Sequence, residues 1–266
     1  MVRIGVVGSG GRMGKAIIAA LHKDKSLHLQ GVVERGDAHE RGAAGPSVAR
    51  VTSELDVLAV ECDVLVDFSH ADAVPATLAA ARRARVAVVI GTTGLSAADH
   101  AAIDAAARDI AVLQTANTSV GVAVLARLVA NAAAALPDWD IDIVDLHHRG
   151  KRDAPSGTAL ALGAAAAAAR GLALADVRLP SHSADGPVRP RGTVGFASLR
   201  AGSTAGDHMV LFAGDGERIE LHHRAESRDI FAAGAVRAAV WLAGRPPGRY
   251  TMDDVLGPGA AGPTRP

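Results

Sequence analysis

VRIGVVGSGGRMGKAIIAAL, residues Val2–Leu21, joins an apolar run, a glycine-rich turn and an alanine-rich segment. Val2–Val7 is almost continuously apolar, as is typical of a parallel strand covered on both faces. After the turn, Met13, Ile17 and Leu21 recur every four residues, which predicts a helix with one apolar face. The stretch therefore predicts a strand that leads through a glycine turn into a helix.

The same alternation continues through the first half of the chain. Apolar runs predict strands at Leu27–Val33, Asp63–Phe68, Val86–Ile90 and Ile110–Leu113, with helices over residues 73–83 and 96–108 between them. Strands separated by helices of this length form doubly wound parallel sheets. We therefore expect an α/β fold with a Rossmann-like domain over residues 1–118.

The pattern after Asn117 is α+β. Helices are expected over residues 119–136 and 158–170, and strands at Ile141–His147, Val194–Leu199, His208–Phe212 and Arg218–His222. Closely spaced strands with glycine turns predict a mostly antiparallel or mixed sheet in a second domain over residues 119–228. Residues 229–257, which start with an apolar helix over about residues 229–242, are expected to return to the first domain. Residues 258–266, rich in Gly and Pro, are expected to be disordered.

Composition narrows the possible functions. The 266 residues are 49% hydrophobic, which suffices for two domain cores. Because 28 basic residues balance 28 acidic ones, we expect neither nucleic acid nor a membrane as a partner. No segment has the anatomy of a signal peptide or approaches the roughly 20 apolar residues of a membrane span, so we expect a cytoplasmic protein.

The single cysteine, Cys62, excludes an intramolecular disulfide and is interpreted as a core residue.

The glycine turn, in its strand-to-helix context, is typical of dinucleotide binding. Glycines allow the tight turn and the close approach of a pyrophosphate, and the helix start supplies amide groups. Glu34 follows Gly14 by 20 residues, at the end of the next predicted strand, where a carboxylate can accept hydrogen bonds from ribose hydroxyls. Arg35 can pair with a 2′-phosphate, so we predict that either NADH or NADPH serves as cofactor. The expected cofactor contacts here are Gly8, Ser9, Gly10, Gly11, Arg12, Met13, Glu34 and Arg35.

Two later strand ends are expected at the same site. Open parallel sheets bind ligands at the carboxyl ends of their strands. The residues that follow two of these ends are Gly91, Thr92 and Thr93, and then Thr115, Ala116, Asn117 and Thr118. We expect both groups to position the nicotinamide, with simple turn chemistry as the alternative.

HHRGKRDAPSGT, residues 147–158, leaves a predicted strand and enters a predicted helix. Five of its first six residues are His, Arg or Lys, and the amides of its last three residues stand at the helix start, where anions bind. Histidine and lysine also transfer protons. The alternatives are a solvated basic loop and a metal site shared with His222 and His223, and we expect no metal because no third ligand lies at a short spacing. Ser156 lacks the Gly-x-Ser-x-Gly context of a nucleophile.

With these motifs in order, the chain resembles the dihydrodipicolinate reductase family along nearly its whole length. Besides the segments above, the resemblance rests on Asp67-Phe68-Ser69, Gly94, Ser119-Val120-Gly121, Gly195-Phe196-Ala197, Ser227-Arg228, Gly234-Ala235-Val236-Arg237 and Trp241-Leu242. The resemblance implies that the chain is an enzyme, an oxidoreductase of diaminopimelate and lysine biosynthesis. The implied reaction is the reduction of 4-hydroxy-tetrahydrodipicolinate to tetrahydrodipicolinate by NADH or NADPH, with loss of water. The resemblance also implies a homotetramer formed through the sheets of the second domains.

Site residues carry over by position. The resemblance implies that His147 is a proton donor or acceptor and Lys151 a proton donor, while His148, Lys151, Gly157 and Thr158 bind the small cyclic dicarboxylate. A substrate with two carboxylates needs cations and free amides to bind it, and the segment 147–158 contains both. Which of His147 and Lys151 protonates the substrate stays open at this point.

Three positions depart from the family pattern. Thr118 stands where many members have Phe, Gly150 where some have His, and His70 where others have Arg. The expected effects are weaker packing on the nicotinamide, one fewer carboxylate contact and an altered affinity for a 2′-phosphate. An active enzyme is still expected, because none of these departures removes His147 or Lys151.

Two other functions make different demands on the sequence. A dehydrogenase acting on aspartate semialdehyde would need a nucleophilic cysteine in the second domain, but Cys62 lies in the first half. A non-catalytic NAD(P)-binding regulator would not need His147 and Lys151 together and would show no turnover.

Overall fold

The computed structural model describes residues 1–33, 51–52, 54–179 and 188–258. The chain divides into two compact units. Unit 1 consists of residues 1–120 and 229–266, and unit 2 of residues 121–228. Within the described ranges, no helix is long and apolar enough to cross a membrane.

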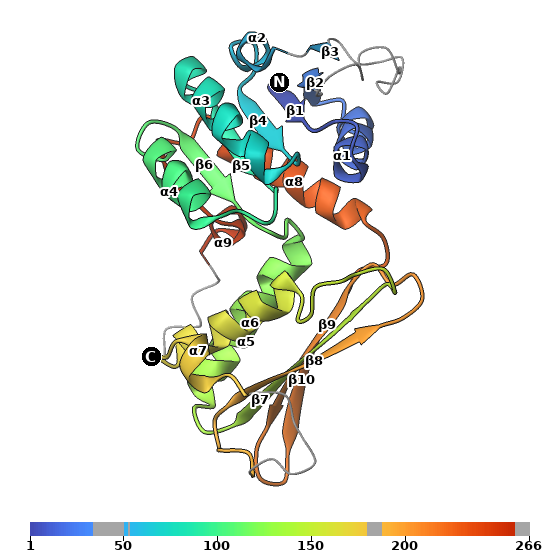
Figure 1. Ribbon diagram of the computed structural model, residues 1–266, viewed down its shortest axis with the longest axis vertical. Helices are drawn as coiled ribbons and strands as arrows, with labels where there is room; N and C mark the ends of the chain where they lie inside the picture. The colour runs from blue at the N-terminus through green and yellow to red at the C-terminus, as the bar shows by residue number, and fades with distance from the viewer. Residues whose placement is uncertain (34–50, 53, 180–187, 259–266) are drawn as a thin grey trace, which may run out of the picture. The chain divides into compact units, whose positions relative to one another are not determined.

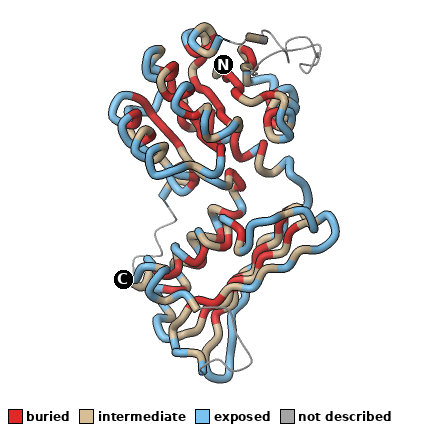
Figure 2. Tube along the Cα trace, in the orientation of Figure 1, coloured by how far each residue is buried: buried red, intermediate tan, exposed pale blue. Residues whose placement is uncertain are grey.

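Unit 1 is built on a parallel sheet. Its strands are β1 (Val2–Val7), β2 (Leu27–Val33), β3 (Val51–Thr52), β4 (Val64–Asp67), β5 (Ala87–Ile90), β6 (Ala111–Gln114) and β11 (Gly248–Tyr250). They lie in the order β11-β6-β5-β4-β1-β2-β3, and all the described pairings are parallel. The central strands β4 and β5 are buried along their whole length, as the red tube in Figure 2 shows. The predicted doubly wound α/β sheet is therefore confirmed.

Helices cover both faces of this sheet (Figure 1). One face packs against α2 (Leu55–Ala59), α3 (Val74–Ala84) and α4 (Ala97–Ala106), and the 3₁₀ turn η2 (Ala71–Ala73) leads into α3. On the other face, α8 (Asp229–Leu242) packs against α1 (Arg12–Lys23) and against β4, β5 and β6. After α8 the chain adds β11 beside β6 and ends its described part with α9 (Met252–Leu256).

Unit 2 is a mixed four-stranded sheet with helices on one side (Figure 1). Its elements are α5 (Val120–Ala135), β7 (Asp140–His147), α6 (Gly157–Ala169), α7 (Leu174–Val177), β8 (Val194–Arg200), β9 (Asp207–Ala213) and β10 (Arg218–Arg224). The order is β10-β9-β7-β8, in which β8 runs parallel to β7 while β9 is antiparallel to both β7 and β10. The predicted mixed sheet is thus confirmed.

The helix-covered face of this sheet changes from apolar to polar along β7. Burial alternates along the strand, so that Ile141, Ile143, Asp145 and His147 all point to the covered face. Ile141 and Ile143 belong to the core that unit 2 builds with α5 and α6. Asp145 and His147 extend the same face beyond that core, and a buried polar end of the sheet results.

Candidate active site

The glycine turn closes against the end of β4. Gly8 has a φ of +83°, and a Cβ added there would come within 2.8 Å of the Phe68 carbonyl oxygen. A Cβ on Gly14 would fall 2.3 Å from the Gly8 carbonyl oxygen. Only glycine therefore fits these two positions.

The first turn of α1 has the features of an anion site. Its N-cap is Gly11, which provides no side-chain hydrogen bond to the helix amides, and the turn contains no acidic residue. The amides of a helix start carry partial positive charge and bind phosphates. The turn and the helix together fit the pyrophosphate of a dinucleotide.

Asp67 holds the neighbouring loops together. It lies at the carboxyl end of β4 with no exposed surface, and it accepts hydrogen bonds from Ser69 (Oγ, 2.6 Å), Thr77 (Oγ1, 2.6 Å) and Thr92 (Oγ1, 3.0 Å). Its backbone carbonyl also accepts a hydrogen bond from the Gly91 amide. The loops after β4 and β5 are thereby fixed beside the glycine turn.

The residues expected around the nicotinamide occupy the same edge of the sheet but differ in exposure. Thr92 is buried and supports Asp67, whereas Thr93 is exposed. The hydroxyl of Thr115 donates to the Asn117 carbonyl at 2.8 Å and shapes the loop after β6. Thr118 is 2% exposed, and its hydroxyl donates to the Phe231 carbonyl of α8 at 2.6 Å. The Thr118 side chain is thus used for packing within unit 1.

Two of the expected cofactor residues, Glu34 and Arg35, lie outside the described residues. Ser9 is buried in the turn, while Gly10 and Met13 are half-buried and Gly11 and Arg12 are exposed. His70, which departs from the family pattern, is exposed at the N-cap of η2.

In unit 2, Asp145 is the centre of a buried polar network. Its Oδ1 accepts from His147 Nδ1 at 2.9 Å and from Arg200 Nη1 at 2.7 Å. Its Oδ2 accepts from Ser198 Oγ at 2.7 Å and from the Ser156 amide at 3.2 Å. Burial alone would raise the pKa of Asp145, but these hydrogen bonds and the charge of Arg200 hold it below its ordinary value.

The pKa of His147 is also lowered. Burial is the largest cause, the charges of Lys151 and Arg200 act in the same direction, and Asp145 opposes them. At neutral pH the ring is therefore uncharged. A carboxylate can only accept, so Nδ1 carries the hydrogen and Nε2 keeps a free electron pair. Gly206 faces this atom, because a Cβ at position 206 would lie 3.0 Å from His147 Nε2.

Lys151 lies close enough to His147 for its charge to lower the pKa of that histidine. The contacts of Lys151 itself are with residues of the same loop. Its Nζ forms an ion pair with Asp153 Oδ2 at 2.8 Å, and its amide donates to the His148 carbonyl. The Lys151 side chain is 23% exposed, so Nζ is a cation that solvent and ligands can reach. The partly exposed pair with Asp153 contributes little to stability and does not bury the charge.

The start of α6 forms a second anion site. Ser156 is the N-cap, and its Oγ accepts from the Ala159 amide at 3.1 Å, which leaves the Gly157 amide outside the cap. Gly157 is exposed, and a Cβ added to it would meet no atom within 4 Å, so the space beside this residue is open. Thr158 follows in the same turn, half-buried. A 13-residue helix with no acidic residue in its first turn attracts an anion here.

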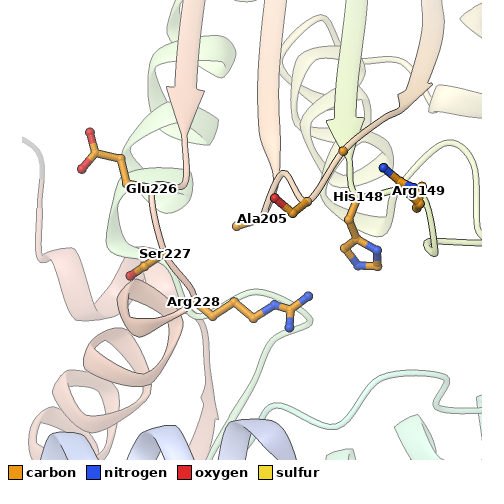
Figure 3. A pocket seen from close by; sticks show the side chains of 8 residues that line it. His148, Arg149, Ala205, Glu226, Ser227 and Arg228 are labelled. Carbon is orange, nitrogen blue, oxygen red and sulfur yellow. The ribbon is translucent and has the colours of Figure 1, made fainter.

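A cavity of about 710 Å³ opens beside His148 within unit 2 (Figure 3). It is lined by His148, Arg149, Gly202, Ser203, Ala205, Glu226, Ser227 and Arg228. In Figure 3 the side chains of His148 and Arg228 point toward the same open space, whereas Glu226 points away from it. This cavity thus presents the basic side chains of His148 and Arg228 to a ligand, and Arg149 also lines it. Lys151, Gly157 and Thr158 are not among its lining residues.

Sequence patterns pointed to His147 and Lys151 but not to the residues that support them. Asp145, Ser198, Arg200 and His208 come from three strands and meet only in the folded sheet. The one available signal was the spacing of Asp145 and His147, since residues two apart on a strand share a face. Over the part of the chain that the structure describes, no group of three or more His, Cys, Asp or Glu side chains could hold a metal ion.

Comparison with protein families gives two matches. Residues 2–118 match the model described as "Dihydrodipicolinate reductase, N-terminus", and residues 121–256 match "Dihydrodipicolinate reductase, C-terminus". A 4-hydroxy-tetrahydrodipicolinate reductase of Zymomonas mobilis is 52% identical over 257 residues, which cover 96% of this chain and 97% of the relative. A protein of the same description from Mesorhizobium japonicum is 48% identical, with coverages of 95% and 96%.

Solved structures with the same fold include a dipicolinate-bound dihydrodipicolinate reductase from Paenisporosarcina. It is 22% identical, with a TM-score of 0.79 over 96% of this chain and 100% of that chain. GenD2 of gentamicin A biosynthesis, solved in complex with NAD, is 20% identical, with a TM-score of 0.60 over 96% of this chain and 90% of that chain. Unit 1 accordingly has an NAD(P)-binding fold.

Proposed function

The chain belongs to the dihydrodipicolinate reductase family, and from this premise we propose how its own residues carry out the reduction. It is an oxidoreductase with 4-hydroxy-tetrahydrodipicolinate reductase activity in lysine biosynthesis. We propose that NADH or NADPH reduces 4-hydroxy-tetrahydrodipicolinate to tetrahydrodipicolinate with loss of water, that unit 1 binds the dinucleotide and that unit 2 binds the dicarboxylate.

Unit 1 is the proposed dinucleotide site. Gly8–Met13 would hold the pyrophosphate through the amides of the turn and of α1. The loops at Gly91–Thr93 and Thr115–Thr118 would position the nicotinamide, Thr118 through its backbone because its hydroxyl is bonded to Phe231. When bound, the dinucleotide supplies the hydride. The residues outside the described ranges, Glu34 and Arg35, remain our prediction for the adenosine ribose and the 2′-phosphate.

Unit 2 is the proposed dicarboxylate site. The open amide of Gly157 and its neighbour Thr158, at the positive end of α6, would bind one carboxylate. The basic side chains of His148 and Lys151 would bind the substrate as well, since charge-assisted hydrogen bonds to carboxylates are strong. A dipicolinate molecule bound to the Paenisporosarcina reductase supports a dicarboxylate of this shape as the ligand.

The electrostatics of the loop suggest different roles for the two proton-transfer residues. His147 is neutral, with its Nδ1 hydrogen bonded to Asp145, so its Nε2 can accept a proton but has none to give at neutral pH. Lys151 Nζ is a partly exposed cation and is the group able to donate. We therefore infer that Lys151 delivers the proton next to the carbon that receives hydride, and that His147 accepts a proton and orients the loop.

One observation carries this proposal. A single loop places His147, oriented by a buried carboxylate, together with the cation Lys151 and the open start of α6. This arrangement combines a proton acceptor, a proton donor and an anion site, which together are the groups needed to reduce a dicarboxylate.

The test is to follow the absorbance of NADPH and, separately, of NADH with freshly prepared substrate. We expect oxidation of both, because Glu34 suits one cofactor and Arg35 the other. A preference of about a thousandfold for either cofactor would contradict dual use. Absence of oxidation with both would overturn the proposed reaction and favour a non-catalytic NAD(P)-binding protein.

A homotetramer is also proposed. The face of the unit 2 sheet opposite α5 and α6 carries Val144, Leu146, Leu199, Met209 and Leu211 beside charged residues such as Asp142 and Glu220, and Leu199 is 53% exposed. These apolar side chains on a mixed face suit pairing with the same face of a second copy. The cytoplasmic location expected from the sequence stays a prediction.

A further inference from the structure

His208 is a buried histidine that the proposed reaction does not yet use. It lies on β9 directly opposite Asp145 of β7, and 4% of it is exposed. Its Nε2 lies 3.1 Å from Ser156 Oγ, the cap of α6. Its ring also meets the His147 ring edge to face, with 5.2 Å between the centroids. His208 thus contacts both the anion site and the proton-transfer histidine.

A hydrogen bond joins His208 to the cap of α6. Ser156 Oγ accepts from the Ala159 amide and still has one hydrogen and one lone pair, so its hydrogen bond with His208 Nε2 can form with either neutral tautomer of the ring. Burial lowers the pKa of His208 to about 4, which agrees with a neutral ring at neutral pH.

Packing alone does not account for a histidine here. Nδ1 of His208 is buried and has no hydrogen-bond partner among the residues that the structure describes. An unpaired buried polar atom opposes folding, so an apolar side chain would stabilise this position better. Polar groups that oppose folding are found where a site needs them.

We propose that His208 is a positioning residue that fixes Ser156, and with it the start of α6, in register with His147. The inference rests on the proposed dicarboxylate site and adds a residue to its support. Ser156 connects the two parts directly, because its amide donates to Asp145 while its hydroxyl is hydrogen-bonded to His208. The carboxylate-binding amides and the proton-transfer ring are therefore held by one shared network.

The experiment is calorimetric titration of dipicolinate into the protein with NADH present, for the wild type, His208→Leu, Ser156→Ala and the double variant. His208→Leu is expected to weaken binding about tenfold, the effect of one ordinary hydrogen bond. The effects of the two single changes should not add in the double variant, since both break the same contact. His208→Gln, whose side-chain amide can donate to Ser156 or accept from it, should restore most of the affinity.

Phe212→Leu is the matched control. Phe212 lies on the same strand and the same face of the sheet, fully buried but outside the polar network. This change should lower the melting temperature and leave the dipicolinate Kd unchanged. If Phe212→Leu weakened binding as much as His208→Leu, the effect would be one of general stability and the positioning role would be wrong.

The outcomes separate this inference from the proposed function. Equal binding by the wild type and His208→Leu, or fully additive effects with Ser156→Ala, would overturn the role of His208 alone. Failure of the wild type to bind dipicolinate would overturn the dicarboxylate site and the inference with it.

Discussion

Asp145 is the residue on which the electrostatics of the proposed site depend. It is fully buried, and its two oxygens accept from His147, Arg200, Ser198 and the Ser156 amide. A carboxylate with this many donors stays ionised and fixes the tautomer of His147. It also ties Arg200, whose Nη2 donates to the Asp153 carbonyl, to the loop that carries Lys151.

Asp145→Asn is expected to lower kcat by a factor on the order of a hundred or more, because an amide no longer fixes the hydrogen on His147 Nδ1. The buried charge of Arg200 loses its partner, so a lower melting temperature is expected as well. Steady-state kinetics and thermal melts of the purified variant check both. Asp138→Asn, at an exposed position, is the control, and wild-type kcat in Asp145→Asn would contradict the role of the carboxylate.

Buried neutral histidines predict a pH-dependent stability. Histidine in an unfolded chain has a pKa of about 6.5, whereas burial lowers that of His208 to about 4 and lowers that of His147 as well. The unfolded chain therefore binds these protons first, and their contribution to stability, complete above pH of about 6.5, is lost as the pH falls toward about 4.

Melting temperatures measured between pH 8 and pH 4 should accordingly fall more steeply for the wild type than for His208→Leu, which lacks one of the two histidines. Identical slopes for the two proteins would show that His208 does not titrate in this window.

For single residues, the sequence identifies those that stand out in a motif by their chemistry. It does not identify residues that join the site only when the chain is folded. His147 and Lys151 stand out because a basic cluster precedes a helix start. His208 lies 61 positions after His147, and nothing near it in the sequence marks it as a site residue. Asp67 was noticed only as part of a family motif, although it supports Ser69, Thr77 and Thr92.

Among the single elements, α6 combines two roles. Its first turn is the proposed anion site, and the rest of the helix packs in the hydrophobic core of unit 2. Its apolar residues, such as Leu162 and Ala166, pack against the sheet. The Ser156 cap uses the Ala159 amide and leaves Gly157 open. Helix stability and ligand binding can therefore be separated experimentally at this turn.

Gly157→Ala should preserve folding and weaken the dicarboxylate site. The added methyl group meets no atom within 4 Å, and alanine is the better helix former by up to about 1 kcal/mol. The melting temperature should be unchanged or slightly higher. The dipicolinate Kd should rise about tenfold, because the methyl group occupies the approach to the amide. Unchanged binding would place the carboxylate elsewhere.

Elements with a clear apolar pattern were predicted well, including the four-residue strands β4, β5 and β6, whereas several short elements without one were not. The strand Val2–Val7 and the helix Asp229–Leu242 have the predicted bounds, since each has a clear apolar pattern. No pattern in the sequence predicts β11 or α9, which are three and five residues long, and the short helices α2 and α7 are not predicted either. Such segments are too short for periodicity to be seen, and β11 is a strand because it pairs with β6.

The whole molecule combines two folds that the sequence distinguishes by their patterns. Continuous apolar strands mark the parallel sheet of unit 1, and alternating burial marks the one-sided sheet of unit 2. The strand order could not be read from the chain, because pairings such as β4 with β1 depend on tertiary packing. The proposed reaction assigns hydride donation to unit 1 and proton transfer to unit 2.

The proposed tetramer depends on the open face of the unit 2 sheet. Leu199→Glu introduces a charge at a half-exposed position of that face. We expect light scattering coupled to size-exclusion chromatography to show a tetramer for the wild type and smaller species for the variant, because burying an unpaired charge is unfavourable. A monomeric wild-type protein would contradict the proposed assembly.

The central claim is that the loop of His147 and Lys151 transfers protons during the reduction. The most direct measurement is kcat for Lys151→Ala and His147→Ala, with NADPH binding measured on the same samples and Lys25→Ala, an exposed lysine of unit 1, as control. We predict that Lys151→Ala loses about a hundredfold or more in kcat, that His147→Ala is also impaired, and that both bind NADPH like the wild type. Wild-type kcat in both variants would contradict the account.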